Sequence, residues 1–505
     1  MLGSLCEISG ESLGRGDAVS SQSPRSTGAT EVVRSAASKT APREGGQEGG
    51  SVKDGTEANR LYETKATAVS EGAKHVADPH PANRWKWAEA SVWTERMVSA
   101  LDNGVKGCKA TKWFGLMDKV ERPSTLAAAW QRVARNSGAA GVDRQSIERF
   151  AADSEGYLSE LSQSLKDRSY RPQALKRVDI PKHDGKTRPL GIPTVKDRIV
   201  QTALKFVLEP IFEAQFLEAS YGFRPGLSCK DALREVDGLL KDGYHFVVDA
   251  DLQSYFDSIP HAPLMQRIEE RISDGAVLAL IERFLKADIV QEAGRWTPTG
   301  GTPQGAVISP LLANVYLHPL DVLMKASQTR MVRYADDFVI LCRTRREADA
   351  ALERVRGWVQ TNGLTLHPDK THVGDARQPG EGFEFLGYRF EAGRTDVRKK
   401  SLESLKARIK QHTRRTRGVS LACIVSELNP LLKGWFGYFK HAHKHTFGTL
   451  DGQIRRRLRA LLRKQEKRPG FGRNYHDHQR WPNAYFAEAG LFALHTAWQN
   501  ARQPR

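Results

Sequence analysis

The sequence has few cysteines and no long apolar run. Five cysteines are scattered over 505 residues, and no two of them form a Cys-x-x-Cys pair. This pattern argues against a disulfide framework and against a cysteine-ligated zinc site, and it fits a reducing compartment. No apolar stretch approaches the roughly 20 residues of a membrane span. The N-terminus also lacks the basic-then-apolar order of a secretory signal. We therefore expect a cytoplasmic protein with no membrane partner.

Positive charge is what the sequence has in excess. The chain carries 77 Lys and Arg against 59 Asp and Glu, a formal net charge of +18. A strongly basic protein usually binds a polyanion, and nucleic acid is the most common one. Charge alone leaves open a second interpretation, in which the surface is simply solvated and has no specific partner.

Composition divides the chain into several regions. Residues 1–80 are rich in Gly, Ser, Ala, Thr and Glu and show no apolar period, which predicts a disordered extension. Large apolar residues begin at Trp85, and their spacing predicts a helical region over 85–168. In residues 169–392 strand-like and helix-like pieces alternate, which predicts an α+β domain.

The most basic region follows, over residues 398–475, and precedes a tail at 476–505. Between Arg398 and Arg468 there are 20 Lys and Arg against 4 Asp and Glu, an excess of 16 positive charges. Apolar residues here recur at helical spacing, namely Ile454, Leu458, Leu461 and Leu462. This spacing predicts a helix with one apolar face, and arginines cover the rest of it.

Acidic residues stand next to apolar runs at two places. Asp251 closes the run that begins at Phe246, and the pair Asp336–Asp337 lies between two apolar runs, as at the tip of a β-hairpin. Joining nucleotides uses two divalent ions held by carboxylates, and magnesium prefers oxygen ligands. The alternative is a solvated Asp-Asp turn, which aspartate also favours. Asp249 shares a strand face with Asp251, and the pattern alone does not choose between them.

Four ordered motifs carry a resemblance to a known family. Residues 334–337, Tyr-Ala-Asp-Asp, resemble the Tyr-x-Asp-Asp signature of reverse transcriptases. Residues 251–257 resemble their first catalytic motif, and residues 301–305 with 309–314 resemble the template and nucleotide motif between the two. The match is most similar to group II intron reverse transcriptase/maturases, from about Trp85 to the C-terminus.

The resemblance implies a fold and a function. The expected fold class is α+β: a right-hand polymerase with fingers and an antiparallel palm sheet, followed by an α-helical thumb or maturase domain. The expected function is RNA-directed DNA synthesis on the protein's own group II intron RNA during retromobility, with binding of that RNA to assist splicing. The expected partners are intron RNA, template RNA with primer DNA, deoxynucleoside triphosphates and target DNA. Alternatives are a splicing cofactor without polymerase activity, or a reverse transcriptase of the retron or diversity-generating type.

The family motifs also imply a catalytic centre. Asp251, Asp336 and Asp337 are expected to be the catalytic residues and the ligands of two Mg²⁺ ions. Asp249 is expected to lie outside the first coordination shell. This assignment depends on the resemblance, because the residue pattern by itself left the choice open.

Four further residues are expected to bind the incoming nucleotide. Residues 180–193 have the pattern of a hairpin with an Asp-Gly turn. On this hairpin, Lys182 and Arg188 resemble residues that contact the triphosphate; a basic hairpin facing solvent is the alternative. Phe256 resembles a wall beneath the sugar that disfavours a 2′-hydroxyl, although it could be a core aromatic. The resemblance places Gln304 near the nucleotide.

The basic C-terminal region resembles the maturase domain of the same family, through residues 428–439. Its arginines are expected to neutralise RNA phosphates, so that affinity falls steeply with salt. The five candidates are Arg455, Arg456, Arg457, Arg459 and Arg463. Many relatives add an HNH endonuclease module with cysteine ligands. No cysteine follows Cys423, so we expect no such module and leave the mode of priming open.

Overall fold

The computed structural model describes residues 112–181, 187–291 and 294–502. The extension predicted to be disordered, residues 1–80, lies outside the described residues, and so does Lys182. None of the described helices is both long enough and apolar enough to cross a membrane.

In the described part of the chain, which begins at residue 112, four helices precede the first strand. They are α3 (Met117–Val120), α4 (Pro123–Asn136), α5 (Ile147–Ala152) and α6 (Ser154–Lys166). A proline at the first position of α4 suits a helix start, because that residue's N–H would have no partner within the helix. Leu126 and Val133 of α4 are buried, and α4 packs against the later helix α7 (Val195–Glu213). α7 is one of the helix-like pieces expected within residues 169–392, and it is buried over much of its length.

A first sheet contains the predicted hairpin. Its strands are β1 (Leu175–Pro181), β2 (Thr187–Ile192), β4 (Ile289–Gln291) and β5 (Gly294–Trp296), in the order β2-β1-β4-β5. β1 and β2 pair antiparallel, with Pro181 opposite Thr187 at the end where the two strands are connected. β1 and β4 pair in parallel, which brings the chain back to the hairpin after about 100 residues and was not predicted.

A second sheet of four antiparallel strands forms the palm. Its strands are β3 (Phe246–Asp251), β6 (Arg330–Tyr334), β7 (Asp337–Cys342) and β8 (His372–Asp375), in the order β6-β7-β3-β8. Successive side chains of β3 enter two different cores: Val248 is buried on one face and Val247 on the other. Both faces are therefore covered, which fits the near-continuous apolar character of β3 and β7.

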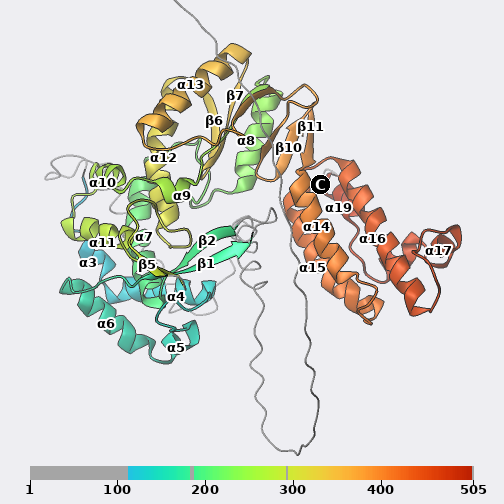
Figure 1. The fold of residues 1–505 in the computed structure, drawn as a ribbon, viewed down its shortest axis with the longest axis horizontal. Helices are drawn as coiled ribbons and strands as arrows, with labels where there is room; N and C mark the ends of the chain where they lie inside the picture. The colour runs from blue at the N-terminus through green and yellow to red at the C-terminus, as the bar shows by residue number, and fades with distance from the viewer. Residues whose placement is uncertain (1–111, 182–186, 292–293, 503–505) are drawn as a thin grey trace, which may run out of the picture. The chain divides into compact units, whose positions relative to one another are not determined.

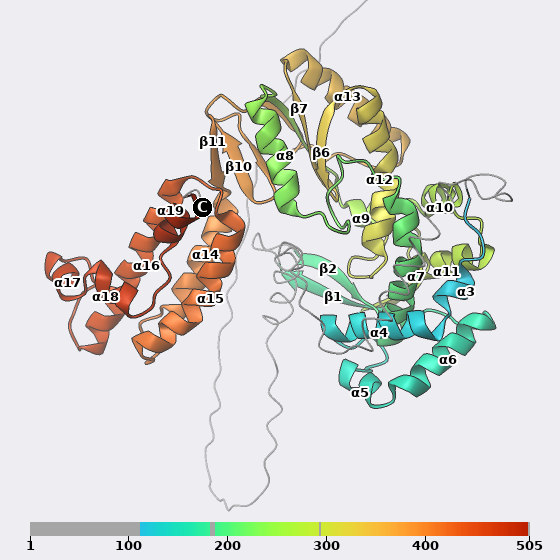
Figure 2. The same ribbon diagram turned by 180° about the vertical axis from the view of Figure 1, so that it is seen from behind.

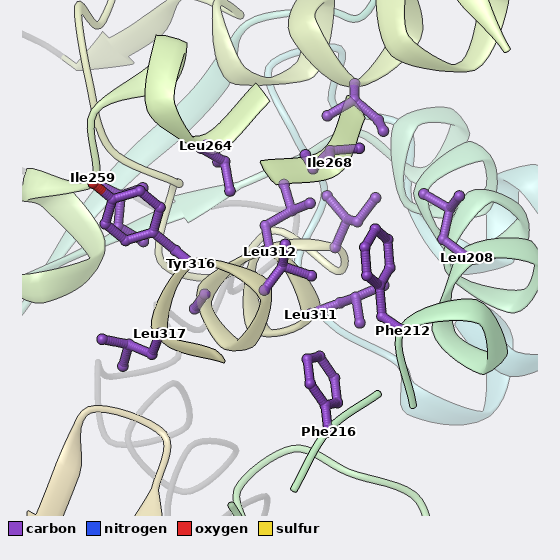
Figure 3. Close-up of a cluster of buried hydrophobic side chains, with 14 of the residues drawn as sticks. Leu208, Phe212, Phe216, Ile259, Leu264, Ile268, Leu311, Leu312, Tyr316 and Leu317 are labelled. Carbon is purple, nitrogen blue, oxygen red and sulfur yellow. The ribbon is translucent and has the colours of Figure 1, made fainter. Parts of the chain in front are cut away.

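Helices cover both faces of the palm sheet (Figure 1). The further helices of this domain are α8 (Cys229–Lys241), α9 (Tyr255–Ser258), α10 (His261–Glu269), α11 (Gly275–Leu285), α12 (Ser309–Ala326) and α13 (Arg345–Thr361). α8 covers one face, and α12 and α13 cover the other. Leu312 and Tyr316 of α12 belong to the same buried cluster as Leu208 and Phe212 of α7 and Ile268 of α10 (Figure 3).

A small sheet leads into the C-terminal helices (Figure 2). The strands are β9 (Phe383–Phe385), β10 (Tyr388–Glu391) and β11 (Arg394–Val397), and the helices are α14 (Lys399–His412), α15 (Leu421–Phe439), α16 (Lys444–Gln465), α17 (Tyr475–Arg480), α18 (Asn483–Glu488) and α19 (Leu494–Arg502). Reciprocal hydrogen bonds connect the two parts: Tyr388 Oη donates to the Tyr438 carbonyl at 2.6 Å, and Tyr438 Oη donates to the Leu386 carbonyl at 2.8 Å. An α+β fold with an antiparallel palm sheet and a helical C-terminal region is therefore confirmed.

Candidate active site

Strand pairing brings the three predicted aspartates to one end of the palm sheet. β3 and β7 are antiparallel neighbours, and Asp251 stands directly opposite Asp337. Directly opposed residues point to the same face of a sheet. Asp336 lies in the two-residue turn between β6 and β7, beside Ala335, whose φ of +61° is left-handed. Asp249 shares the face of Asp251, one pleat further from the turn.

The carboxylates at this end repel one another in a poorly solvated place. Burial, with Asp249, Asp336 and Asp251 nearby, raises the pKa of Asp337 to about 7. Burial and Asp251 also raise the pKa of Asp336, against the opposing effect of Arg188. Burial raises the pKa of Asp249 to about 6. Each shift records the cost of holding a negative charge there, and a bound cation would remove that cost.

The carboxylate oxygens of the cluster are suitable ligands for a divalent cation, although they do not enclose an ion by themselves. In the described part of the chain, no group of three His, Cys, Asp or Glu side chains is gathered tightly enough to enclose an ion. Magnesium keeps several waters and needs only one or two carboxylates together with substrate phosphates. Asp251 already has a cationic neighbour, because Lys370 Nζ lies 2.5 Å from its Oδ2.

A buried arginine next to the turn holds its backbone in place through hydrogen bonds. Arg333 is fully buried, and its Nε and Nη2 donate to the carboxylate of Asp321, at 2.7 and 2.5 Å. Its Nη1 donates to Asn314 Oδ1 and to the Ala335 carbonyl, both at 2.9 Å. This network ties helix α12 to the backbone of the turn that carries Asp336.

Three of the four predicted nucleotide contacts lie in the described part of the chain. Phe256 is half-buried in α9, and its carbonyl accepts a 2.6 Å hydrogen bond from the Thr302 N–H. The carbonyl of Gln304 accepts a 2.7 Å bond from the Gly191 N–H at the end of β2. Arg188, exposed on β2, is close enough to lower the pKa of Asp336. The loop over residues 301–305 therefore connects the Phe256 turn to the hairpin.

A glycine makes that connection possible. Gly305 has a φ of +106°, and a Cβ there would lie 2.5 Å from the Gly191 carbonyl oxygen. Only glycine lets the loop approach β2 so closely.

The five arginines of α16 divide into two groups. Arg459 is buried: its Nε donates to the Trp481 carbonyl and its Nη2 to Asn483 Oδ1, both at 2.9 Å. Arg463 pairs with Asp477 at 2.6 Å. These two side chains hold the segment after α16, and their expected contact with RNA stays a prediction.

None of the other three arginines is fully buried. Arg457 is half-buried and donates to Thr413 Oγ1 at 2.6 Å and to the Lys410 carbonyl at 3.2 Å. Arg455 is half-buried and Arg456 is exposed. The predicted apolar face of the same helix is buried throughout, as Ile454, Leu458, Leu461 and Leu462.

Two family models match the chain in the order of its motifs. Residues 180–390 match the reverse transcriptase (RNA-dependent DNA polymerase) family, and residues 402–481 match the group II intron maturase-specific domain. Protein YkfC of Escherichia coli K12 is 35% identical over 318 residues, which cover 54% of this chain and 82% of that protein. The chain belongs to the group II intron reverse transcriptase/maturase family.

Other relatives match over a smaller share of their length. The group II intron-encoded protein LtrA of Lactococcus lactis is 39% identical over 203 residues, which cover 40% of this chain and 33% of LtrA. Among solved structures, a partial Cas6-RT-Cas1–Cas2 complex is 27% identical over 49% of this chain and 41% of that chain, with a TM-score of 0.32. The family assignment does not rest on that last similarity.

This reverse transcriptase joins an RNA-directed DNA polymerase domain to a splicing maturase domain, in a family that depends on divalent metal. Sequence reasoning missed Arg333 and Lys370. One signal was available: Arg333 is a cation that directly follows Met331 and Val332 and directly precedes the signature. A charge in that place must either face solvent or find buried partners.

Proposed function

We propose that this enzyme copies its own group II intron RNA into DNA, with Asp251, Asp336 and Asp337 as the ligands of two Mg²⁺ ions. The observation that carries the proposal is the register of β3 and β7, which sets Asp251 opposite Asp337 beside the turn that bears Asp336. When bound, the ions would make the primer 3′-hydroxyl nucleophilic and neutralise the departing pyrophosphate.

The chain's own residues would hold and select the nucleotide. Arg188, on the hairpin, lies close enough to Asp336 to lower its pKa and would bind the triphosphate, since a guanidinium matches phosphate geometry. We propose the same role for Lys182. Phe256 would lie beneath the sugar and exclude a 2′-hydroxyl. Gln304, on a loop fixed at both ends, would contact the nucleotide base pair.

The maturase domain would hold the intron RNA through phosphate contacts. Arg455 and Arg456 are the best placed candidates on α16, with Arg457 beside them, because they are the more accessible ones. Phosphate contacts position an RNA but carry no sequence information, so specificity would come from RNA shape and unpaired bases. Template RNA with primer DNA and, during retromobility, target DNA complete the proposed partners.

Substitution Asp336→Asn tests the proposed metal site. It removes a ligand charge while keeping the side-chain shape. Loss of several kcal/mol of transition-state stabilisation, the usual scale for a catalytic metal, corresponds to about a thousand-fold loss of primer extension. RNA binding, measured by filter retention, should stay unchanged.

A matched control is Asp349→Asn, which changes an exposed carboxylate on α13. This control should extend primers at the wild-type rate. Full polymerase activity of the Asp336→Asn enzyme in magnesium would show that the three-carboxylate assignment is wrong.

A further inference from the structure

A loop segment, residues 219–224, lies alongside strand β6. The Arg333 N–H donates to the Ala219 carbonyl and the Tyr221 N–H donates to the Arg333 carbonyl, both at 2.8 Å. Ser220 and Arg333 are paired in parallel in this short ladder. The segment therefore follows β6 toward the signature turn.

The next residue, Gly222, is pressed against that turn. A Cβ on Gly222 would lie 2.3 Å from the backbone nitrogen of Ala335 and 2.8 Å from the carbonyl carbon of Tyr334. No side chain fits in this space. Asn314 Nδ2 donates to the Gly222 carbonyl at 2.7 Å, so helix α12 holds the glycine in place.

On the other side, Arg224 is fixed by several contacts. Its Nε donates to Glu213 Oε1 at 2.9 Å, and its Nη1 donates to the carbonyls of Leu217 and Ser220, both at 2.6 Å. Phe223 thus stands between two immobilised neighbours. Its φ is +62°, a left-handed conformation that is uncommon for a bulky residue. Such outliers persist only where the surroundings impose them, and they cluster at functional sites.

The ring of Phe223 lies among the residues of the proposed nucleotide pocket. Its centroid is 6.4 Å from that of Phe256, edge to face at 80°, and 6.3 Å from that of Tyr334. The side chain is still 39% exposed. A ring that served only to fill the core would be buried, so the strained backbone does not serve core packing.

We infer that Phe223 is a positioning residue for sugar selection: it supports Phe256 from the side and keeps that ring fixed beneath the sugar. The inference rests on the proposed role of Phe256 as the wall that excludes a 2′-hydroxyl. An edge-to-face neighbour restricts how far the Phe256 ring can turn or retreat. Without the Phe223 ring, the Phe256 ring could move aside and leave room for the 2′-hydroxyl of a ribonucleotide.

The test measures kcat and KM for a deoxynucleotide and its matching ribonucleotide in single-nucleotide extension by the full-length enzyme. Phe223→Ala should raise the ribonucleotide-to-deoxynucleotide ratio of kcat/KM by about 10-fold, the scale of a small steric change in a binding pocket. The gain should come from ribonucleotide kcat/KM rather than from a general loss. Phe223→Tyr keeps the ring and should keep the wild-type ratio.

The double variant separates this inference from the proposal about Phe256. Phe256→Ala alone should raise the ratio more than Phe223→Ala does. Phe223→Ala combined with Phe256→Ala should add little, because both changes act on the same wall. If Phe256→Ala leaves the ratio unchanged, the proposed wall itself is wrong. If Phe256→Ala raises the ratio but Phe223→Ala does not, the wall stands and the role of Phe223 is refuted.

Two further variants control for folding. Phe114→Ala removes another exposed phenylalanine, 65% accessible, and should leave the ratio unchanged. Phe223→Leu keeps most of the volume without the ring edge, so it decides the question if Phe223→Ala does not fold, and it should raise the ratio by a few-fold. Equal losses of kcat/KM for both sugars in these Phe223 variants would indicate a purely structural residue and overturn the inference.

Discussion

The β6–β7 hairpin and helix α16 both place a run of charged residues beside apolar ones, but they use charge differently. In the hairpin, Asp336 and Asp337 remain close to other carboxylates and carry raised pKa values. In the helix, Arg459 and Arg463 are engaged by polar groups of the segment after it. Carboxylates that repel one another without a neutralising partner are available to bind a ligand. Charged side chains whose hydrogen bonds are all made within the protein stabilise the fold instead.

The hairpin also contains a charged residue that stabilises the fold, and the helix also contains one that is accessible to a ligand. Arg333 in the hairpin is a fully buried cation whose donors go to Asp321, Asn314 and the Ala335 carbonyl. Arg456 in the helix is exposed. Burial and partners therefore predict the role of a charge better than its neighbours in the sequence do. The following predictions test that rule, from the largest expected effect to the smallest.

The largest effect is expected for Arg333→Met. Removing one partner of a buried ion pair leaves Asp321 uncompensated, which costs about 3–5 kcal/mol of unfolding free energy. The Ala335 carbonyl also loses a donor, so primer extension should fall together with stability. Denaturant unfolding and primer extension measure the two effects.

A second substitution separates the two losses. Arg333→Met combined with Asp321→Leu removes both charges and should recover much of the stability. It should not recover full activity, because the turn still lacks its support. Full activity in the double variant would show that the network stabilises the fold without positioning the turn.

The buried arginine of α16 should behave in the same way as Arg333, to a smaller extent. Arg459→Met leaves the Trp481 carbonyl and Asn483 without a donor and removes the contact of the guanidinium with the Phe486 ring, 5.3 Å away. Leaving buried polar groups unpaired should cost about 1–3 kcal/mol. The salt dependence of RNA binding should not change in the folded protein. A reduced salt slope with unchanged stability would instead identify Arg459 as an RNA contact.

A structural carboxylate, Asp274, gives the opposite case to Asp337. Its Oδ2 accepts the N–H groups of Leu116 and Met117 at 2.7 and 2.9 Å, while Oδ1 caps α11 by accepting from Ala276 and Val277. The pKa of Asp274 is lowered by these bonds despite partial burial. Burial and neighbouring carboxylates raise the pKa of Asp337, whereas hydrogen bonds from backbone N–H groups lower the pKa of Asp274.

Replacement Asp274→Asn should therefore cost about 1–2 kcal/mol near pH 7, the scale of a lost cap and a charge-assisted bond. A lowered folded-state pKa contributes stability above the unfolded value of about 3.9 and loses it as the pH falls through the folded value. The difference between wild type and variant should consequently shrink from pH 6 toward pH 3. A difference independent of pH would mean that the carboxylate charge contributes nothing.

Much of the hairpin could be predicted from the sequence, because an acidic turn between apolar strands is a local pattern. What could not be predicted is the partner: that Asp251 stands opposite Asp337 depends on strand register between segments more than 80 residues apart. The choice of Asp251 over Asp249 came from family resemblance, since both share a face. For α16, helical period gave the apolar face correctly. The partners of Arg459 follow 22 and 24 residues later, beyond the reach of periodicity.

The smallest effect on stability, and the clearest one on binding, is expected for the accessible arginines. Arg455→Ala and Arg456→Ala should leave the unfolding free energy within about 0.5 kcal/mol, as is usual for surface substitutions. Each should reduce the slope of log affinity against log salt by about 0.7–0.9, the contribution of one phosphate contact. Filter binding of a structured RNA over a salt series measures that slope, with Arg459→Met as the matched control. If the Arg459 variant lowers the slope and the Arg456 variant does not, burial is a poor guide to function in this domain, and the comparison between hairpin and helix fails at its simplest point.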